Sequence, residues 1–365
     1  VRAWQKNRSA ASGASWIHRS DIDGQPDPPG PPPPAADLPA LDLATLGRAI
    51  DTTWRRTSYS GLTQALHDQP PTHVLADEAA VVDVAVPAPQ DPALQEPSPM
   101  TGLPAGAAFG TMVHEALERL SWGPDALEAS ALAVVAQLGP QHALERSLQP
   151  TLASALVAVC RTPLHPLTAH ALTDLPTTRR LPELDFDLPL ADRGAPATLR
   201  RLADLMAQHL PSTDPLSAYP ERLRSSEAAD SVLNGFLTGS IDAVLQLDDG
   251  RFLVVDYKTN RLSPAGEPEV TLGHYVAPAM AEAMMQAHYP LQAILYCVAL
   301  HRFLSTRLPG YAPERHLGGV GYLFVRGMAG PTTPVVDGAS CGVMAWHPSA
   351  ALVVAASELL GGVDA

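Results

Sequence analysis

Residues 235–258 read GFLTGSIDAVLQLDDGRFLVVDYK and contain the clearest structural pattern in the chain. Side chains alternate on both sides of the tripeptide 248–250, Asp-Asp-Gly, and such alternation around a short loop with glycine predicts a β-hairpin. If Gly250 takes the left-handed position of a three-residue loop, Leu247 faces Arg251. The register of the two strands can then be counted outward from this loop.

That register places two carboxylates opposite each other. Asp242 faces Asp256, and Lys258 lies on the same side of the sheet. Facing carboxylates repel by roughly 0.2–1 kcal/mol when exposed, so we expect a cation between them. Mg²⁺ or Mn²⁺ suits these ligands, because both are hard cations that also accept water and phosphate. A solvated hairpin with scattered charge is the alternative when this motif is taken alone.

The other face of the hairpin is apolar, so we expect it to belong to the core and the acidic face to meet solvent or a cleft. The predicted core residues are Ile241, Ala243, Leu245, Leu247, Leu253, Val255 and Tyr257.

Composition limits the possible architectures and partners. The chain has 365 residues, and its 37 prolines are unevenly distributed, which indicates one domain with linkers. Hydrophobic residues make up 46%, enough for one sizeable core. The formal net charge of −14 argues against a surface that binds nucleic acid throughout. Any DNA contact must therefore be local or be supplied by a partner.

Cysteine usage and hydropathy indicate the compartment. Cys160, Cys297 and Cys341 are far apart and odd in number, which fits a reducing cytoplasm and excludes a four-thiolate zinc or iron–sulfur site within this chain. The sequence has no apolar run of membrane-spanning length and no signal peptide at its start. We expect a cytoplasmic protein without a membrane partner. Because the sequence begins at Val1 and not at Met, we also expect it to be part of a longer chain.

Proline-rich segments divide the chain. We expect residues 1–20 to be the tail of an upstream domain, 21–104 to be a linker, and 105–365 to be the main folded domain. The run PDPPGPPPP at 26–34 predicts a semi-rigid polyproline II tether, with recognition by a PxxP-binding module as the alternative. The linker also contains TSYSGL at 57–62.

Other patterns predict the elements around the hairpin. Strands are expected at 183–188 and 319–325, with a further strand possible at 80–86. Helices are expected at 42–51, 109–120, 124–138, 141–148, 150–160, 197–209, 277–288, 291–304 and 348–361.

Several of these elements carry residues capable of chemistry. His114 lies on the helix at 109–120, beside Glu115 and Glu118, although a helical histidine is more often an ordinary surface or core residue. Gln292 and Tyr296 share one face of a later helix, as residues four positions apart do. None of these residues indicates a function by itself.

Taken in order, the motifs are more specific: a helix with a histidine, a carboxylate strand, a D-x-K strand and a Q-x-x-x-Y helix. This order resembles the nuclease domain of the RecB family, within the PD-(D/E)xK superfamily. The resemblance covers about residues 100 to 360 and the TSYSGL segment. The strings that carry it are GTMVHEALE, GFLTGSIDAVL, VVDYKTNRL, AMMQAHYPLQAILYCVALHRFL and HLGGVGYLFVRG.

The resemblance implies an α/β fold with a PD-(D/E)xK, restriction-endonuclease-like core. A central mixed β-sheet would be flanked by helices, with an α-rich N-terminal block and a Pro-rich N-terminal linker. The family's metal ligands fall on His114, Asp242, Asp256 and the backbone carbonyl of Tyr257, and Lys258 matches the catalytic lysine.

Other matches are weaker. Gln292 and Tyr296 match residues that pack on the site and help to place DNA, and Glu183 is similar in position to an acidic residue on the strand before the hairpin in the family. Thr238 and Ser240 stand where larger residues are common in the family, which puts the local packing in doubt.

The implied function is a Mg²⁺-dependent deoxyribonuclease, similar to exodeoxyribonuclease V, with Mn²⁺ as a substitute metal. It would be the exonuclease or endonuclease domain of a RecB-like helicase–nuclease subunit in double-strand-break processing and recombinational repair. The implied partners are single-stranded DNA ends delivered by a motor, a helicase domain upstream in the same parent chain, and RecC- and RecD-like subunits. No Walker A motif is present, so we expect no ATP site in this sequence, and the cysteine count argues against an iron–sulfur cluster.

Four alternatives stay open. The chain could be an AddA-type nuclease subunit, or a catalytically silent nuclease fold that binds DNA or acts as a scaffold. It could also be a nuclease that acts on RNA, or a free-standing restriction-type endonuclease. The second alternative is disfavoured by the sequence, because a silent module normally lacks an acidic ligand or the lysine.

Overall fold

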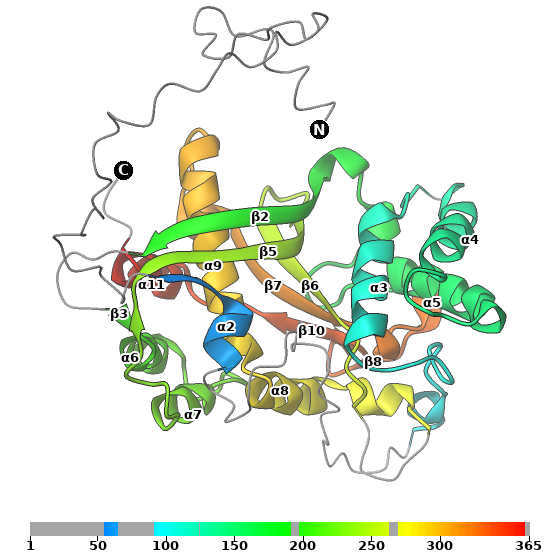
Figure 1. The fold of residues 1–365 in the computed structure, drawn as a ribbon, viewed down its shortest axis with the longest axis horizontal. Helices are drawn as coiled ribbons and strands as arrows, with labels where there is room; N and C mark the ends of the chain where they lie inside the picture. The colour runs from blue at the N-terminus through cyan, green and yellow to red at the C-terminus, as the bar shows by residue number, and fades with distance from the viewer. Residues whose placement is uncertain (1–54, 65–90, 124, 191–196, 263–268, 362–365) are drawn as a thin grey trace, which may run out of the picture. The chain divides into compact units, whose positions relative to one another are not determined.

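The structure is a computed structural model, and it describes residues 55–64, 91–123, 125–190, 197–262 and 269–361 (Figure 1). Several predicted segments lie outside the described residues: 1–20, the Pro-rich run at 26–34, the helix at 42–51 and the strand at 80–86.

A six-stranded mixed sheet forms the centre of the described chain (Figure 1). The strand order is β1-β5-β6-β7-β10, in which β1 and β6 pair with different halves of β5. Strand β2 pairs with β5 along its opposite edge. Pairs β1–β5 and β6–β7 are parallel, whereas β2–β5, β5–β6 and β7–β10 are antiparallel. The strands are β1 Arg55–Ser58, β2 Arg180–Leu190, β5 Gly235–Gln246, β6 Phe252–Lys258, β7 Leu317–Phe324 and β10 Val343–Trp346. The predicted central mixed sheet is confirmed.

Helices cover both faces of this sheet, as predicted. One core contains residues of α6 Leu199–His209, α7 Tyr219–Arg224, α8 Ala277–Gln286, α9 Tyr289–Arg307 and α11 Ala350–Leu359. The other contains residues of α3 Ala107–Arg119, α4 Leu127–Leu138 and α5 Gln149–Arg161. Successive strand residues alternate between the cores, since Val254 joins the first and Val255 the second.

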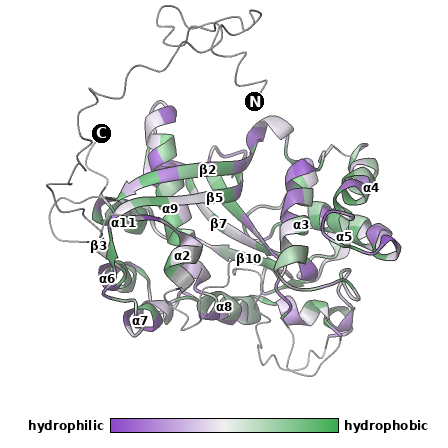
Figure 2. Cartoon of the chain, viewed as in Figure 1, coloured by the Kyte–Doolittle hydropathy of each residue, from purple (hydrophilic) through white to green (hydrophobic). Residues whose placement is uncertain are grey.

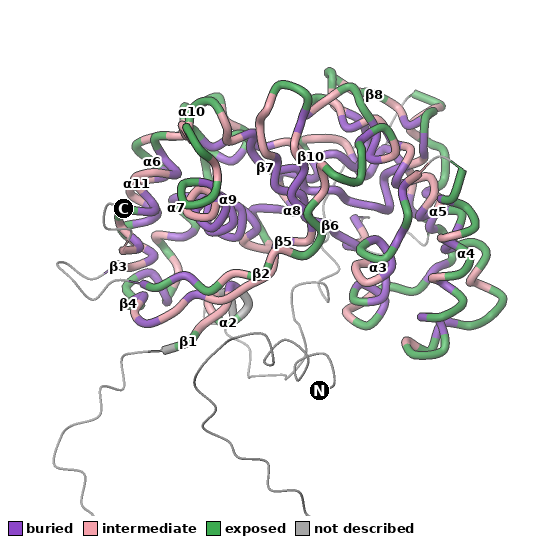
Figure 3. The backbone as a smooth tube through the Cα atoms, turned by 90° about the horizontal axis from the view of Figure 1, so that it is seen from above, coloured by how far each residue is buried: buried purple, intermediate pink, exposed green. Residues whose placement is uncertain are grey.

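The long helix α9 is the most deeply buried of these helices. Its residues from Tyr289 to Leu300 are buried without interruption, and Figure 3 shows it as a buried tube within the fold. Hydrophobic residues colour much of α9 and of the strands that it crosses in Figure 2. An all-round apolar helix of this kind belongs inside a protein. Among the described residues, none of the helices is both long enough and apolar enough to cross a membrane.

The predicted hairpin and its register are confirmed. Gly250 has φ 86°, and the Leu247 amide donates to the Arg251 carbonyl over 2.8 Å. The ladder of β5 and β6 runs outward to the pair Ala243 and Val255, so the next facing positions are Asp242 and Asp256.

The two strands separate at these carboxylates. Strand β5 has 12 residues and β6 has 7, so the first half of β5 extends past the end of the hairpin ladder. That half pairs with β2 on one edge and with β1 on the edge that β6 has left, where Ser58 lies opposite Thr238. Asp242 and Asp256 therefore lie where two neighbouring strands diverge.

The seven predicted core residues of the hairpin are all buried, but they do not lie on one face of it. Ile241 joins the core on the α9 side, whereas Ala243 joins the opposite core, so the faces of β5 exchange at Asp242. Asp256 and Lys258 are each only 2% exposed, because α9 packs across their side of β6. Asp256 and Lys258 are thus buried and not solvated, whereas the side chain of Asp242 is 21% exposed.

The described fold includes residues that precede Ala105, where the folded domain was expected to begin. Strand β1 and helix α2 Tyr59–Gln64 come from the TSYSGL region, and Thr238 donates to the Thr57 carbonyl over 3.4 Å. Further on, Met100 and Leu103 are buried in the core that contains α3. A four-residue strand is too short to show an alternating pattern, and its partner edge exists only because β6 ends early.

Other helices and connections differ in detail from the prediction. Residues 141–148 form turns and a short 3₁₀ segment, since Ala143 has φ 55° and cannot continue a helix. The three cysteines are buried free thiols. The remaining short elements are β3 Ala197–Thr198, β4 Val232–Leu233, α10 Pro313–His316, β8 Val335–Val336 and β9 Ala339–Ser340.

Candidate active site

Asp242 joins the hairpin to helix α3. Its Oδ2 accepts a hydrogen bond from the Tyr257 amide over 2.7 Å and lies 3.2 Å from Nδ1 of His114. The His114 ring also stands edge-on to the Tyr257 ring, with 6.0 Å between centroids. Burial acts to raise the pKa of Asp242, but His114, the Tyr257 amide and Lys258 outweigh it and hold that pKa below its ordinary value. Asp242 is therefore kept ionised.

Asp256 and Lys258 form a buried ion pair. Asp256 Oδ2 lies 2.9 Å from Lys258 Nζ, and both side chains are 3% exposed. Burial raises the pKa of Asp256 to about 7, with a further contribution from the charge of Asp242, while Lys258 acts in the opposite direction. The two facing carboxylates thus differ strongly in how readily they ionise.

Two tyrosines surround the ammonium of Lys258. Its Nζ lies 4.0 Å from the ring centroid of Tyr289 on α9 and 5.6 Å from that of Tyr322 on β7. The rings are stacked with centroids 5.7 Å apart, and both are fully buried. A cation over an aromatic face is stabilised by the ring quadrupole. Sequence reasoning did not identify either tyrosine, although Tyr289 lies three positions before Gln292 on the same helix.

Gln292 and Tyr296 connect to one of these tyrosines through hydrogen bonds. The Gln292 amide nitrogen donates to the Tyr296 hydroxyl over 3.1 Å. The Tyr322 hydroxyl is shared between Gln292 Oε1 at 3.1 Å and the Tyr289 carbonyl at 3.0 Å. Gln292 is 3% exposed, and Tyr296 packs its ring edge-on against Phe186 of β2. The structure therefore places the pair behind Lys258 as part of its support.

Glu183 of β2 lies opposite Asp242 of the paired strand β5. The neighbouring residue pairs are Pro182 with Ala243 and Leu184 with Ile241. It has φ 47°, a strained conformation for a residue other than glycine. The charge of Glu118 is the largest cause that raises its pKa, followed by its partial burial.

Glu118 is a neighbour of the site that sequence reasoning did not select. It lies four positions after His114, on the same face of α3, and its charge raises the pKa of Glu183. The spacing H-x-x-x-E in GTMVHEALE was the available signal.

These donors fit a hard divalent cation in chemistry. Two carboxylates, one imidazole and the Tyr257 carbonyl make up an oxygen-rich set of the kind that binds Mg²⁺ or Mn²⁺. Two of them already meet, since His114 and Asp242 are 3.2 Å apart. Within the described residues, no group of three His, Cys, Asp or Glu side chains converges as a ready metal cluster. Among the predicted site residues, the structure forms two pairs where β5 and β6 diverge, His114 with Asp242 and Asp256 with Lys258. Gln292 and Tyr296 lie beside Tyr322, and Glu183 lies opposite Asp242.

Comparisons with known proteins point to one family. The family model described as the PD-(D/E)XK nuclease superfamily matches residues 93–340. RecBCD enzyme subunit RecB of Mycobacterium tuberculosis (strain H37Rv) is 44% identical over 337 residues, which is 88% of this chain and 30% of that protein. The RecB subunit of Mycolicibacterium smegmatis is 43% identical over 99% of this chain and 33% of its own length. That of Escherichia coli K12 is 32% identical over 88% and 24%. The chain thus spans a third or less of these relatives.

Proposed function

The chain belongs to the PD-(D/E)XK nuclease superfamily as a RecB-like nuclease domain, and on this premise we propose that it is a Mg²⁺-dependent deoxyribonuclease of the exodeoxyribonuclease V type. The observation that supports this most is the meeting of His114, Asp242, Asp256 and Lys258 where β5 and β6 diverge. A solvated hairpin would not bury a carboxylate and a lysine at 2% exposure.

Nucleases of this superfamily generally depend on a divalent metal. We propose Asp242, Asp256, His114 and the Tyr257 carbonyl as its ligands, for Mg²⁺ or for Mn²⁺ in its place. When bound, the metal would polarise the scissile phosphate and lower the pKa of a water molecule.

The chain's own groups divide the remaining work. Lys258 would donate hydrogen bonds to the phosphate oxygens as negative charge develops on them. Tyr289 and Tyr322 would hold that ammonium in one orientation, so that little reorganisation is needed during reaction. Asp242 has the lower pKa of the two carboxylates, so it would stay ionised and ready to hold a cation.

The setting of the whole protein is part of the same proposal. The matching relatives are named as RecB subunits of the RecBCD enzyme. By this likeness, the domain would process single-stranded DNA ends delivered by a helicase motor of the same parent chain, beside RecC- and RecD-like subunits, in double-strand-break repair. An AddA-type subunit is the alternative with the same chemistry.

The test is a cleavage assay on labelled single-stranded DNA in Mg²⁺, with an RNA oligonucleotide of the same sequence beside it. Asp256→Asn and Lys258→Ala should each lower the rate by at least about 10³-fold, because each removes a group that acts in the transition state. Asp249→Ala is the matched control, since this exposed aspartate lies in the hairpin loop and pairs with Arg251. Wild-type rates in Asp256→Asn, or cleavage of RNA alone, would contradict the proposal.

Thermal unfolding with and without metal distinguishes a metal ligand from the catalytic lysine. Added Mg²⁺ or Mn²⁺ stabilises any protein that binds it in the folded state. This thermal shift should vanish in Asp256→Asn and persist in Lys258→Ala, because an ammonium cannot be a metal ligand. A catalytically silent scaffold would show no metal-dependent cleavage in the wild type.

A further inference from the structure

Arg326 is a buried cation just behind the site. It lies in a single 3₁₀ turn, Val325–Gly327, directly after β7, and is 3% exposed. Its Nε donates to the Thr259 carbonyl over 2.9 Å, its Nη1 to the Met100 carbonyl over 3.2 Å, and its Nη2 to the Pro104 carbonyl. Among the described residues, no carboxylate forms an ion pair with it. The guanidinium is thus committed to backbone carbonyls.

These carbonyls belong to the two segments that supply the site. Thr259 directly follows Lys258 at the end of β6. Pro104 precedes the start of α3, the helix that carries His114, by three positions. The guanidinium also lies 5.2 Å from the ring centroid of Phe109 in the first turn of α3. One side chain therefore links the helix that carries the histidine to the strand that carries the lysine.

The turn that holds Arg326 is itself fixed from two sides. A Cβ atom at Gly327 would lie 2.3 Å from Cβ of Tyr275, so this turn lies directly against that tyrosine. The Tyr275 hydroxyl donates to the Asn260 carbonyl over 2.9 Å. On the other side, Ser98 Oγ donates to the Arg326 carbonyl over 2.5 Å. Both the arginine and the backbone after Lys258 are therefore held in one arrangement.

We propose that Arg326 is a positioning residue that sets the separation between α3 and the end of β6, and so between His114 and the pair Asp256 and Lys258. This inference rests on the proposed function. Arginine suits the task because its planar guanidinium directs several donors at once, whereas a lysine ammonium is a single point charge. A buried donor that loses its acceptor carries the full cost of desolvation, so the three carbonyls and the guanidinium constrain one another.

A matched arginine elsewhere separates positioning from general stability. Arg302 on α9 donates to the Ser357 hydroxyl and carbonyl and to the Pro189 carbonyl. It clamps α9 to α11 and to the end of β2, and it is in contact with none of the proposed ligands. The variants are Arg326→Lys, Arg326→Met, Arg302→Lys and Arg302→Met in the full chain.

Each variant is measured in three ways: thermal unfolding, Mn²⁺ affinity without DNA, and single-turnover cleavage of single-stranded DNA at saturating Mn²⁺. Losing a group that orients metal ligands typically weakens metal binding by about 10- to 100-fold. A displacement near 1 Å slows reaction by about 10²-fold. Arg326→Lys should therefore bind Mn²⁺ at least about tenfold more weakly and cleave about 10²-fold more slowly, while Arg302→Lys stays within about twofold in both at a comparable loss of melting temperature.

Two results would overturn the inference. One is an Arg326→Lys protein within twofold of wild type in both Mn²⁺ affinity and rate. The other is an equal loss of Mn²⁺ affinity and cleavage rate in the Arg302 variants, in proportion to their loss of melting temperature. If Arg326→Met does not fold, Arg326→Lys decides, because it keeps the buried charge and can still reach one carbonyl. A wild-type chain that binds Mn²⁺ but cleaves no DNA would contradict the proposed function alone, and the affinity comparison would still test the positioning.

Discussion

Lys258 shows how a single residue depends on neighbours that are distant in sequence. An ammonium that is 2% exposed keeps its charge only where a carboxylate and other favourable contacts replace water. Asp256 supplies the carboxylate, and Tyr289 and Tyr322 supply aromatic faces. In the metal-free protein, removing Asp256 would leave a buried unpaired charge, which typically costs about 3–5 kcal/mol. Asp256→Asn loses the same charge, but its amide oxygen can still accept a hydrogen bond from Lys258, so it disturbs the site less than Asp256→Ala does.

The Tyr289 ring should matter more than its hydroxyl. Tyr289→Phe keeps the aromatic face over Lys258 and loses the hydrogen bond to Asn260 Oδ1, which measures 3.0 Å. Tyr289→Leu loses both, including a desolvated cation–π contact of about 2 kcal/mol. We expect cleavage to fall less than about fivefold in Tyr289→Phe and about 30-fold or more in Tyr289→Leu, because 1.4 kcal/mol corresponds to tenfold.

Single-turnover rates well below both melting temperatures measure this difference. A metal-induced thermal shift should persist in both variants, since neither removes a ligand. Equal rates in Tyr289→Phe and Tyr289→Leu would mean that the ring does not act on Lys258.

At this scale, the sequence predicted the carboxylates but not their surroundings. The loop 248–250 determines the register of the hairpin, and so the facing of Asp242 and Asp256, from local information alone. The positions of Tyr322 and Arg326 depend instead on how α9 and the 98–104 segment pack on the sheet. Such contacts between distant segments leave no periodic pattern in the sequence.

Among the elements, α3 is the one whose placement matters most, since it carries His114 and Glu118. The last carbonyls of a helix have no partners within it and form the negative end of its dipole. Arg180 of β2 meets this need by donating to the carbonyls of Leu117 at 2.7 Å and Glu118 at 3.0 Å. Its guanidinium also lies 3.6 Å from the ring centroid of Trp122. Arg326 holds the start of α3 and Arg180 its end.

Removing this cap should loosen the end of α3. Arg180→Ala loses charged hydrogen bonds worth about 1.5–3 kcal/mol each at most, so we expect a net destabilisation of about 2 kcal/mol. Amide hydrogen exchange in the last turn of α3 should quicken. Arg119→Ala is the control, because its exposed pair with Glu115 is worth about 0.3–0.5 kcal/mol. Denaturant unfolding of both variants decides: a cost for Arg180→Ala no larger than that for Arg119→Ala would rule out the cap.

Strand β1 marks the limit of prediction for elements. Long alternating or helical segments such as β5, α3 and α9 were predicted close to their observed bounds, because each carries its own pattern. The four residues of β1 carry no such pattern, and their pairing depends on a free edge of β5 that only the completed sheet provides. The exchange of faces at Asp242 was missed for the same reason, because it needs the strained partner Glu183 across the strand pair.

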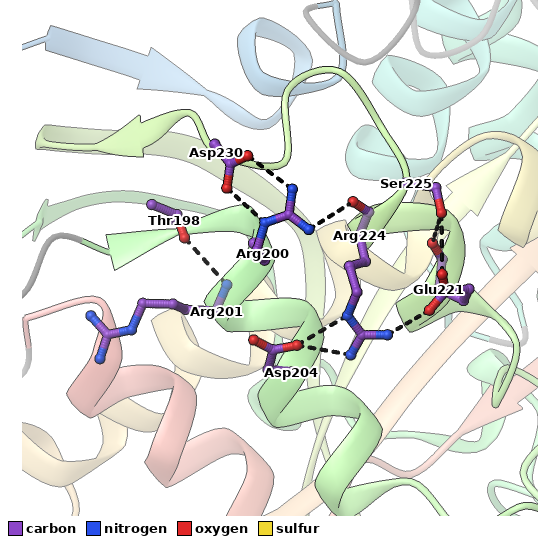
Figure 4. Close-up of polar contacts among 8 residues, drawn as sticks. All are labelled: Thr198, Arg200, Arg201, Asp204, Glu221, Arg224, Ser225 and Asp230. Atoms are coloured by element: carbon purple, nitrogen blue, oxygen red, sulfur yellow. Dashed lines mark hydrogen bonds and ion pairs between the residues drawn. The ribbon is translucent and has the colours of Figure 1, made fainter.

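For the whole molecule, charge limits how the domain can hold DNA. The chain has a formal net charge of −14. In the described part, at least eight arginines already pair with carboxylates. Figure 4 shows one such network, in which Arg200 binds Asp230 through two nitrogens and Arg224 binds Asp204 and Glu221. Arg180, Arg302 and Arg326 are committed to backbone carbonyls as well. Within the described residues, more arginines are engaged with carboxylates or carbonyls than are left for phosphates.

The full chain should therefore bind single-stranded DNA weakly and with a shallow salt dependence. For a single strand, the logarithm of the binding constant falls linearly with the logarithm of the salt concentration. The slope is about −0.7 for each phosphate that the protein neutralises. With about three contacts, an increase from 50 to 200 mM salt weakens binding by about 20-fold, whereas six to ten contacts give about 10³-fold or more on duplex DNA. Binding is measured with a labelled oligonucleotide in EDTA, so that no cleavage occurs. Delivery through a tether can make up for weak affinity, because a linked site sees DNA at an effective concentration near millimolar. Nanomolar affinity with a steep salt dependence would instead show that the domain binds DNA tightly by itself. A motor would then not be needed to supply the strand.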